Sequence, residues 1–497
     1  MEWIKNPFAS NHISDWRYVE RMVLSLPNLL EEAHGVLNTT LAFPQSRFLD
    51  LRYDSIPEEE AQFLRLWAVR LIYLSIHYNQ HRHALPEAQA MNKNCRSLRT
   101  QYNISVYDFE CPDAQYLIME NTRSGVGANS DFVLEPTLLA ALATGRVALF
   151  SSFTRFRRPQ KKESVCPRRD FQCFFAPPSP CLPTKQQMGD AYTLTADEKR
   201  ELYVTGQIPE THRDTKVILI SNKHKLPGVK LGDRLPTVVR ETTELLLSGI
   251  PNDDPRRLVM NKALLELDRI DEPRVSLSVS IHTEKFRHAA MFYALRPNLF
   301  NRARLDAILA DSLPANYDPE RLVGLPIRAT DKCLRESECL TLDQHVRATD
   351  KMWKKLDRSL DDSTIVLTTE SREMMTDMQA YAEQKPGLTV LTNSHDKDRD
   401  SGGGTSIRKV IESDILMLSA ISSLQLQLAT RATIGNCCSN FHVMMLTFLS
   451  EGLGAAKEHH FHCLQEEDDP EFLVCCWKGP RCTAIKLEMQ HNATLGT

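Results

Sequence analysis

Hydrophobic positions in the first part of the chain follow a helical spacing. Residues 58–81 carry a broad apolar stripe with the period of a helix. Pro57 and three acidic residues stand at its start, where carboxylates stabilise the positive end of the helix dipole. The segment ends in three histidines that we interpret as the polar end of the helix and not as a metal site: His77, His81 and His83. We predict a helical N-terminal extension over residues 1–108.

Near residue 110 the pattern changes to short apolar runs separated by turns. Residues 115–120 predict a buried strand, 121–129 a glycine-containing turn, 132–144 an apolar helix and 146–150 a second strand. This order of strand, turn, helix and strand is typical of a parallel α/β sheet. We predict a first α/β half-domain over residues 109–315.

The second part of the chain repeats the alternation of apolar strands and helices. Strands are predicted over 322–327, 363–369 and 389–391, followed by a helix over 411–428 and a further strand end at 433–436. The histidine-rich stretch at 459–463 is interpreted as a solvated turn. We predict a second α/β half-domain over residues 316–465 and a C-terminal appendage over residues 466–497.

Composition places the chain among ordinary globular proteins. Of its 497 residues, 42% are hydrophobic and 25% are charged. The formal net charge of −4 argues against broad nucleic-acid binding, which needs a basic face for phosphates. No apolar run reaches the roughly 20 residues of a membrane span, and residues 1–5 do not resemble a signal peptide. We therefore expect a soluble chain, or a lumenal fragment without its anchor.

Cysteine usage leaves the redox state open. The 13 cysteines are too sparse for a disulfide scaffold, and no pair of CxxC motifs suggests structural zinc. Disulfides within the group Cys166, Cys173 and Cys181, or between Cys333 and Cys339, are one interpretation. Reduced, buried thiols are the other.

One segment carries the most specific motif in the chain. Residues 324–332 read Gly-Leu-Pro-Ile-Arg-Ala-Thr-Asp-Lys, and Glu336 follows four residues after Lys332. The pattern resembles the first nucleotide-sugar motif of the α-1,6-fucosyltransferases. Four further pieces resemble that family in the same order along the chain: 121–129, 171–181, Arg296-Pro297 and 434–440.

The resemblance implies a fold and an activity. The fold would be GT-B-like, with two Rossmann-like αβα half-domains facing a cleft, the acceptor side first and the donor side second. The activity would be transfer of fucose from GDP-fucose to a glycan or glycoprotein acceptor, with inversion and without a metal or other cofactor. A Golgi lumen location follows from the family alone.

Three residues are the candidate catalytic groups. Arg328 supplies a planar fork for a phosphate, and Lys332 adds a second positive charge for the departing diphosphate. Glu336, kept ionised by Lys332, is the candidate base for the acceptor hydroxyl. A structural salt-bridge cluster at a strand end is the alternative, and the ordered motifs favour function.

Further residues are assigned to the donor. Backbone N–H groups in the glycine turn would complete a diphosphate cradle, although a tight turn without a ligand has the same sequence. Asp331 would orient Arg328 or Lys332. The predicted donor-binding residues are Gly125, Gly127, Asn129, Asp331, Glu370, Ser439 and Asn440.

Departures from the family pattern define the rival interpretations. Pro326 stands where the family has His, Ala329 replaces its second Arg, and Ser371 replaces one member of an acidic pair. These changes are compatible with an inactive relative that binds glycans or a partner protein, or with a transferase for another sugar nucleotide. Arg328 and Glu336 at the family's spacing favour an enzyme.

Overall fold

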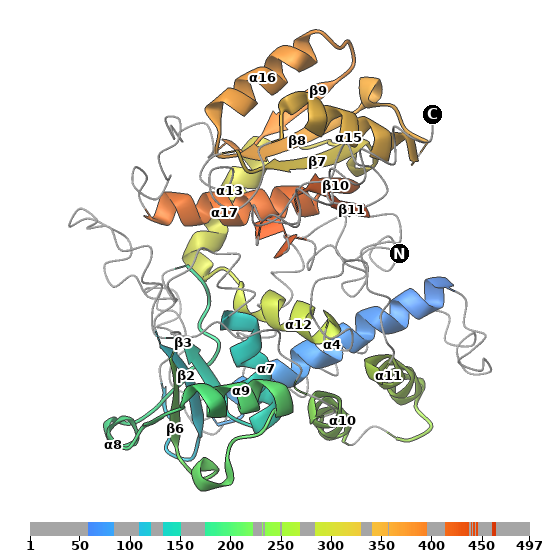
Figure 1. The fold of residues 1–497 in the computed structure, drawn as a ribbon. Coiled ribbons are helices and arrows are strands. Elements are labelled where there is room, and N and C mark those ends of the chain that lie inside the picture. The colour runs from blue at the N-terminus through green and yellow to red at the C-terminus, as the bar shows by residue number, and fades with distance from the viewer. Residues whose placement is uncertain are drawn as a thin grey trace, which may run out of the picture. The chain divides into compact units, whose positions relative to one another are not determined.

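The computed structural model describes two compact units of the chain (Figure 1). The described residues are 58–83, 109–120, 133–150, 174–221, 231, 234–248, 251–268, 284–329, 340–355, 357–394, 413–436, 439, 441–442, 444–445 and 460–463. Those up to Asn301 belong to the first unit and those from Arg302 onward to the second. The division falls within helix α13 (Leu299–Ser312), whereas the boundary predicted from sequence is 315/316.

The first unit contains a parallel four-stranded sheet. Its strands are β2 (Tyr116–Glu120), β3 (Val147–Phe150), β5 (Tyr192–Thr193) and β6 (Val217–Ser221), in the order β3-β2-β6-β5. Helix α7 (Glu135–Thr144) joins β2 to β3 and ends at Gly145, whose left-handed φ of 67° favours glycine. The strand-helix-strand unit predicted from sequence is confirmed.

Helices complete the first unit. Helix α4 (Glu58–His81) packs against α7 and against α10 (Arg234–Leu246), α11 (Pro255–Leu265) and α12 (Glu284–Ala294). The remaining helices are α8 (Lys185–Gly189), α9 (Ala196–Thr205), η7 (Glu210–His212) and η8 (Glu266–Asp268). The predicted helix over 58–81 is confirmed, and it forms part of the core of this unit.

The end of α4 differs from its interpretation as a polar helix end. The side chains of His77 and His81 are buried, with exposed fractions of 0% and 1%, and their rings lie 4.1 Å apart. Because α12 packs along α4, the histidines face Tyr293 of that helix and not solvent.

A disulfide links two strands outside the main sheet. Strands β1 (Phe109–Glu110) and β4 (Cys181–Leu182) are parallel, and Cys111 is bonded to Cys181. Cys166 and Cys173, the partners that the sequence suggested for Cys181, lie outside the described residues. The pairing with Cys111 arises from the strand contact, which brings together residues 70 positions apart.

Loss of this disulfide is expected to destabilise the first unit. Constraint of a 70-residue loop in the unfolded chain corresponds to about 4 kcal/mol in the chain-entropy model. The double variant Cys111→Ser/Cys181→Ser should therefore unfold at lower urea concentration. The parent protein under reducing conditions should behave like the variant. A difference below about 0.5 kcal/mol would show that the cross-link does not constrain the unfolded chain.

The second unit contains a parallel five-stranded sheet. Its strands are β7 (Leu322–Ile327), β8 (Thr364–Thr369), β9 (Thr389–Thr392), β10 (Ala432–Gly435) and β11 (His460–Cys463), in the order β11-β10-β7-β8-β9. The predicted strands are confirmed, but 460–463 is a strand and not a turn. It pairs in register with β10, so main-chain hydrogen bonding at the sheet edge determines its conformation.

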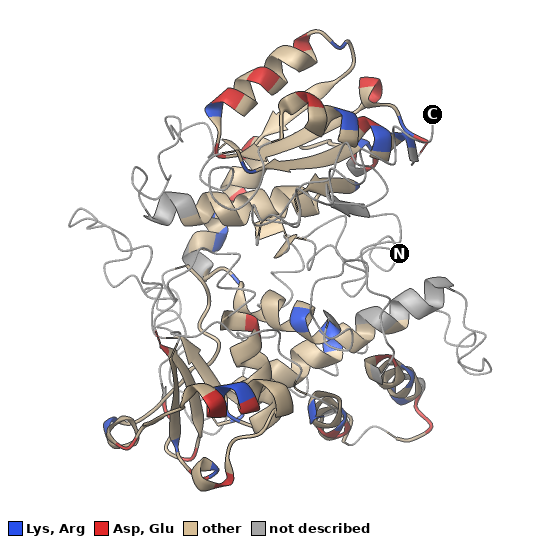
Figure 2. Ribbon diagram, in the orientation of Figure 1, with Lys and Arg blue, Asp and Glu red and all other residues tan. Residues whose placement is uncertain are grey.

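Helices pack against this sheet, and two short 3-10 helices lead into its strands β7 and β8. They are η10 (Pro319–Arg321), α15 (Leu342–Lys355), η11 (Leu360–Asp362), α16 (Arg372–Glu383) and α17 (Ser413–Leu428). Charged residues lie mostly on helices, and the strands are nearly free of charge (Figure 2). Such uncharged strands are typical of a parallel sheet covered on both faces. Together the two units form an α/β fold with two Rossmann-like parallel sheets, as predicted.

Gly324 permits the close packing of α17 on the centre of the second sheet. A Cβ atom at this position would collide with Gln427 Oε1 and would lie 2.7 Å from Thr433 Oγ1 and 2.8 Å from Thr430 Oγ1. Gln427 is held in place, because its Nε2 donates to Val366 O at 2.9 Å. There is therefore little room for even one methyl group.

Gly324→Ala is expected to lower the free energy of unfolding by about 1–3 kcal/mol through overpacking. Thermal unfolding followed by circular dichroism measures the effect. Gly189→Ala is a matched control, since a Cβ there meets no atom within 4 Å. Equal melting temperatures for the two variants would contradict the packing argument.

Candidate functional site

The strand order of the second unit defines where a ligand is expected. From β7 the chain runs outward through β8 to β9 and then returns to β10 on the other side of β7. The order therefore reverses between β7 and β10. In open α/β sheets, ligands bind at the carboxyl ends of the strands beside such a reversal.

Two predicted site residues meet at this edge. Arg328 directly follows β7 and Glu370 directly follows β8. The two residues lie side by side because Ile327 and Thr369, the last residues of these strands, are paired in register. Arg328 Nε lies 2.9 Å from Glu370 Oε1. The carboxylate is almost wholly buried, with 4% of its side chain exposed, whereas 26% of the arginine side chain is exposed. Glu370 thus holds the inner part of a guanidinium that reaches the surface of the sheet edge.

Ser439 comes from the third strand at this edge. It follows β10, the neighbour of β7 across the reversal, and its backbone N–H donates to Asn436 O at 2.9 Å. The residue is 3% exposed, and its hydroxyl has no hydrogen-bond partner in the described part of the chain. Since buried hydroxyls are usually paired, this oxygen is suited to a bound group.

The departures from the family pattern have structural roles here. Pro326 lies in β7 beyond the two residues of that strand that pair with β10, Val323 and Gly324. It remains in register with Thr368 of β8, and its N atom has no hydrogen to donate to the sheet. Ala329 packs against the core cluster of the unit. Ser371 caps α16, because its hydroxyl accepts from Met374 N–H at 3.3 Å.

The other predicted site residues lie outside the described residues. These are Gly125, Gly127, Asn129, Asp331, Lys332, Glu336 and Asn440. Their roles therefore stay predictions. The geometry supports a joint location only for Arg328, Glu370 and the strand end that carries Ser439.

Arg296, part of the Arg-Pro pair, lies in the interior of the first unit. Its Nε donates to Tyr293 O at 2.8 Å and its Nη2 to Pro177 O at 3.3 Å. The guanidinium lies 3.8 Å from the centre of the Tyr293 ring. These contacts join the end of α12 to the proline-rich segment 174–180, which is a structural role.

A lysine at the carboxyl edge of the first sheet was not singled out from sequence. Lys199 of α9 donates from Nζ to Ser221 O, the last residue of β6, at 2.8 Å. Burial lowers the pKa of Lys199 to about 8. A lone lysine in an amphipathic helix gives no sequence signal of this placement.

The described residues show neither a metal-ligand cluster nor a membrane-spanning helix. No group of three or more His, Cys, Asp or Glu side chains there is arranged to hold a metal ion. Within the same part of the chain, no helix has both the length and the apolarity for crossing a bilayer. Metal independence stays a prediction.

Comparisons with known proteins give a likeness of fold. No protein-family model matches the sequence, and no curated protein sequence matches it. A mutant of Arabidopsis thaliana FUT1 in complex with GDP is similar at 15% identity and a TM-score of 0.39, over 78% of this chain and 76% of that chain. The NodZ α-1,6-fucosyltransferase co-crystallized with GDP is similar at 14% identity and a TM-score of 0.30, over 66% of this chain and 90% of that chain. POFUT1 in complex with GDP is similar at 10% identity and a TM-score of 0.34, over 70% of this chain and 98% of that chain.

Proposed function

We propose that the chain is an inverting, metal-independent fucosyltransferase that uses GDP-fucose and a glycan or glycoprotein acceptor. The observation that carries the proposal is the position of Arg328. It stands at the carboxyl end of β7 beside the strand-order reversal, is held by Glu370, and belongs to the motif that resembles a nucleotide-sugar site.

The proposed reaction is a direct displacement. The acceptor hydroxyl oxygen attacks the anomeric carbon of fucose, while the bond from that carbon to the diphosphate oxygen breaks and GDP departs. Arg328 and Lys332 stabilise the negative charge that develops on the diphosphate. The hydroxyl proton passes to the Glu336 carboxylate, and attack from the opposite face inverts the configuration.

The remaining predicted residues would complete the donor site. Ser439 and Asn440 would contact the donor from the strand end next to β7. The unpartnered hydroxyl of Ser439 supports this role. Gly125, Gly127 and Asn129 stay predicted donor-binding residues of the glycine turn.

A transferase for a different sugar nucleotide is the second candidate. Pro326 is buried in β7, Ala329 packs against the core cluster and the Ser371 hydroxyl caps a helix, so none of them offers the polar group of the family pattern. This observation favours a changed base or ribose contact over a changed diphosphate contact.

The disulfide supports a location in the secretory pathway. Such bonds persist in oxidising compartments and are rare in the cytosol. The Cys111–Cys181 bond therefore agrees with the Golgi lumen that the family resemblance implies.

Isothermal titration calorimetry with GDP, UDP and GDP-fucose tests the proposal. We expect selective binding of GDP and GDP-fucose. Glu336→Gln should bind the donor but lose fucosyl transfer, because the amide cannot accept the hydroxyl proton. Preference for UDP would support a transferase for another sugar nucleotide and would exclude fucose as the donor sugar. No nucleotide binding at all would overturn the proposal and favour a glycan-binding or partner-binding relative.

A further inference from the structure

A second candidate site lies in the first unit, at the sheet edge opposite the strand carboxyl ends. A cavity of about 320 Å³ opens where Gln115 precedes β2, Arg146 precedes β3 and Arg213 precedes β6. Arg234, the first residue of α10, also lines it. In a parallel sheet these amino-terminal ends share one edge. The volume is at the lower end of the range for small-ligand pockets.

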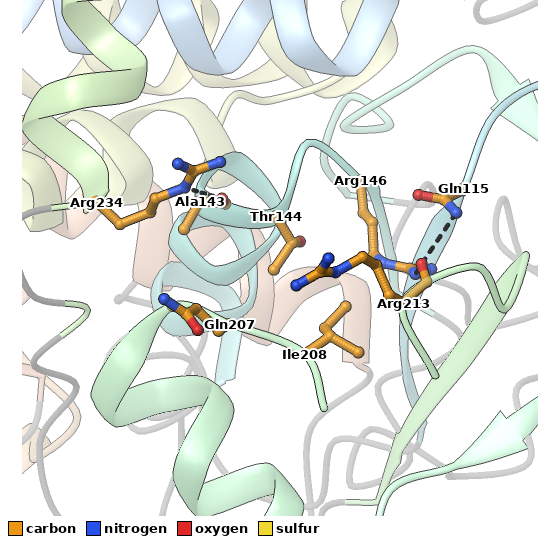
Figure 3. Close-up of a pocket in the computed structure, with 9 residues that line it drawn as sticks. Gln115, Ala143, Thr144, Arg146, Gln207, Ile208, Arg213 and Arg234 are labelled. Atoms are coloured by element: carbon orange, nitrogen blue, oxygen red, sulfur yellow. Dashed lines mark hydrogen bonds between the residues drawn. The ribbon is translucent and has the colours of Figure 1, made fainter. Parts of the chain in front are cut away.

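The lining of this cavity is strongly cationic. It contains three arginines and no Asp or Glu. In Figure 3 the guanidinium groups of Arg213 and Arg234 lie on either side of Thr144, and Gln207 lies below Arg234. Donors therefore approach the same space from several segments of the chain.

Arg146 places a buried positive charge at the base of this edge. Its side chain donates to backbone carbonyls only, with Nη1 2.7 Å from Thr215 O and Nη2 2.7 Å from Arg213 O. The residue is 1% exposed. Burial lowers the pKa of Arg146 to about 10, so that it stays charged at neutral pH. Asp214 acts on this charge electrostatically, but it forms no hydrogen bond or ion pair with Arg146 in the described part of the chain.

Arg234 and Arg213 provide the accessible donors. Arg234 Nε donates to Ala143 O at 3.3 Å, and its two terminal nitrogens make no hydrogen bond in the described part of the chain. Arg213 forms a surface ion pair with Glu210, with Nη1 3.1 Å from Oε1 and with 67% and 81% of the two side chains exposed. Exposed pairs of this kind are weak, so a ligand can replace Glu210.

We propose that this cavity binds a tetrahedral oxyanion, either a free phosphate or sulfate ion or the same group esterified to a saccharide. Guanidinium groups pair with phosphate and sulfate oxygens through charge-assisted, often bidentate hydrogen bonds. Donors that converge from several sides suit a tetrahedral group better than a planar carboxylate. The proposal does not depend on fucosyl transfer, because the cavity lies at the sheet edge away from the strand carboxyl ends.

Calorimetric titration of the full chain at constant ionic strength provides the test. The probes are inorganic phosphate, inorganic sulfate, glucose 6-phosphate and glucose. We expect saturable binding of the anions and none of glucose. A glucose 6-phosphate affinity at least about tenfold above that of inorganic phosphate would identify a saccharide ester as the ligand, and equal affinities would identify the free ion.

Surface variants separate a built site from general attraction of anions. Arg234→Gln and Arg213→Gln should each weaken binding about tenfold or more, the loss expected for a charge-assisted hydrogen bond. Glu210→Gln should strengthen binding, because it releases Arg213. Arg200→Gln is the matched control, since Arg200 is exposed and forms a similar i,i+3 pair with Asp197, 3.5 Å apart.

The outcomes that overturn the proposal are equally specific. They are the absence of saturable anion binding, or binding that neither cavity variant weakens more than Arg200→Gln does. Because Arg234 also caps α7, circular dichroism must first show that its variant is folded. Arg213→Gln alone decides the question if it is not.

Discussion

Arg328→Met is expected to weaken GDP binding about tenfold or more and, in the same protein, to lower the free energy of unfolding. The first effect removes the guanidinium proposed to bind the diphosphate, and charge-assisted hydrogen bonds contribute about 1.5–3 kcal/mol each. The second effect leaves Glu370 buried without this partner. Breaking a buried ion pair costs about 3–5 kcal/mol, and we expect about 2–4 kcal/mol because a quarter of Arg328 is exposed.

A second substitution separates the two effects. In Arg328→Met/Glu370→Gln no buried charge remains at the pair, so most of the lost stability should return, while GDP binding should not. Urea unfolding and calorimetry on the same preparations measure both quantities. Recovery of GDP binding in the double variant would show that Arg328 does not contact the nucleotide. Full stability of Arg328→Met would show that the ion pair is incidental.

The sheet strands were predictable because their signals are local. A run such as residues 364–369 is apolar enough to be buried on both faces and short enough to be a strand, so its sequence determines its conformation. The edge strand β11 is the exception. Its four residues have no apolar run, and they become a strand only through pairing with β10.

The site was predictable only in part, for the same physical reason. Arg328 follows a recognisable strand, so its place at the sheet edge could be expected. Its ion pair with Glu370 depends on the register of β7 and β8, which the sequence does not display. Arg146 and Arg234 of the second cavity are separated by dozens of residues of unrelated pattern, so no motif connects them.

The first unit is expected to lose stability as the pH falls below about 6.5. Burial lowers the pKa of His81 and of His288 to about 3 each, and neighbouring arginine and lysine side chains oppose their protonation further. Burial lowers the pKa of His77 well below its ordinary value, with His81 and Arg296 adding to the effect. All three therefore remain neutral in the folded protein under mildly acidic conditions.

The direction of this change in stability with pH follows from proton uptake on unfolding. An unfolded histidine has a pKa of about 6.5, so below that pH the unfolded chain binds protons that the folded chain does not. Stability is thus fully present above pH 6.5 and is lost on acidification. Between pH 7 and about 5.5 each histidine should contribute a loss of about 1.2 kcal/mol, or about 3–4 kcal/mol for the three. Urea unfolding followed by circular dichroism at the two pH values measures this loss.

The variant His77→Leu tests whether the buried histidines cause the loss of stability on acidification. The two ring nitrogens of His77 are buried without a hydrogen-bond partner in the described part of the chain, so leucine removes unsatisfied polar atoms as well as a titrating group. We expect no loss of stability at pH 7 and about one third less loss on acidification. His212→Gln replaces a histidine outside this buried group, 22% exposed and 3.6 Å from Glu198, and should retain the loss of stability that His77, His81 and His288 cause. If His77→Leu also retains it, carboxylates and not buried histidines govern the acid sensitivity of this unit.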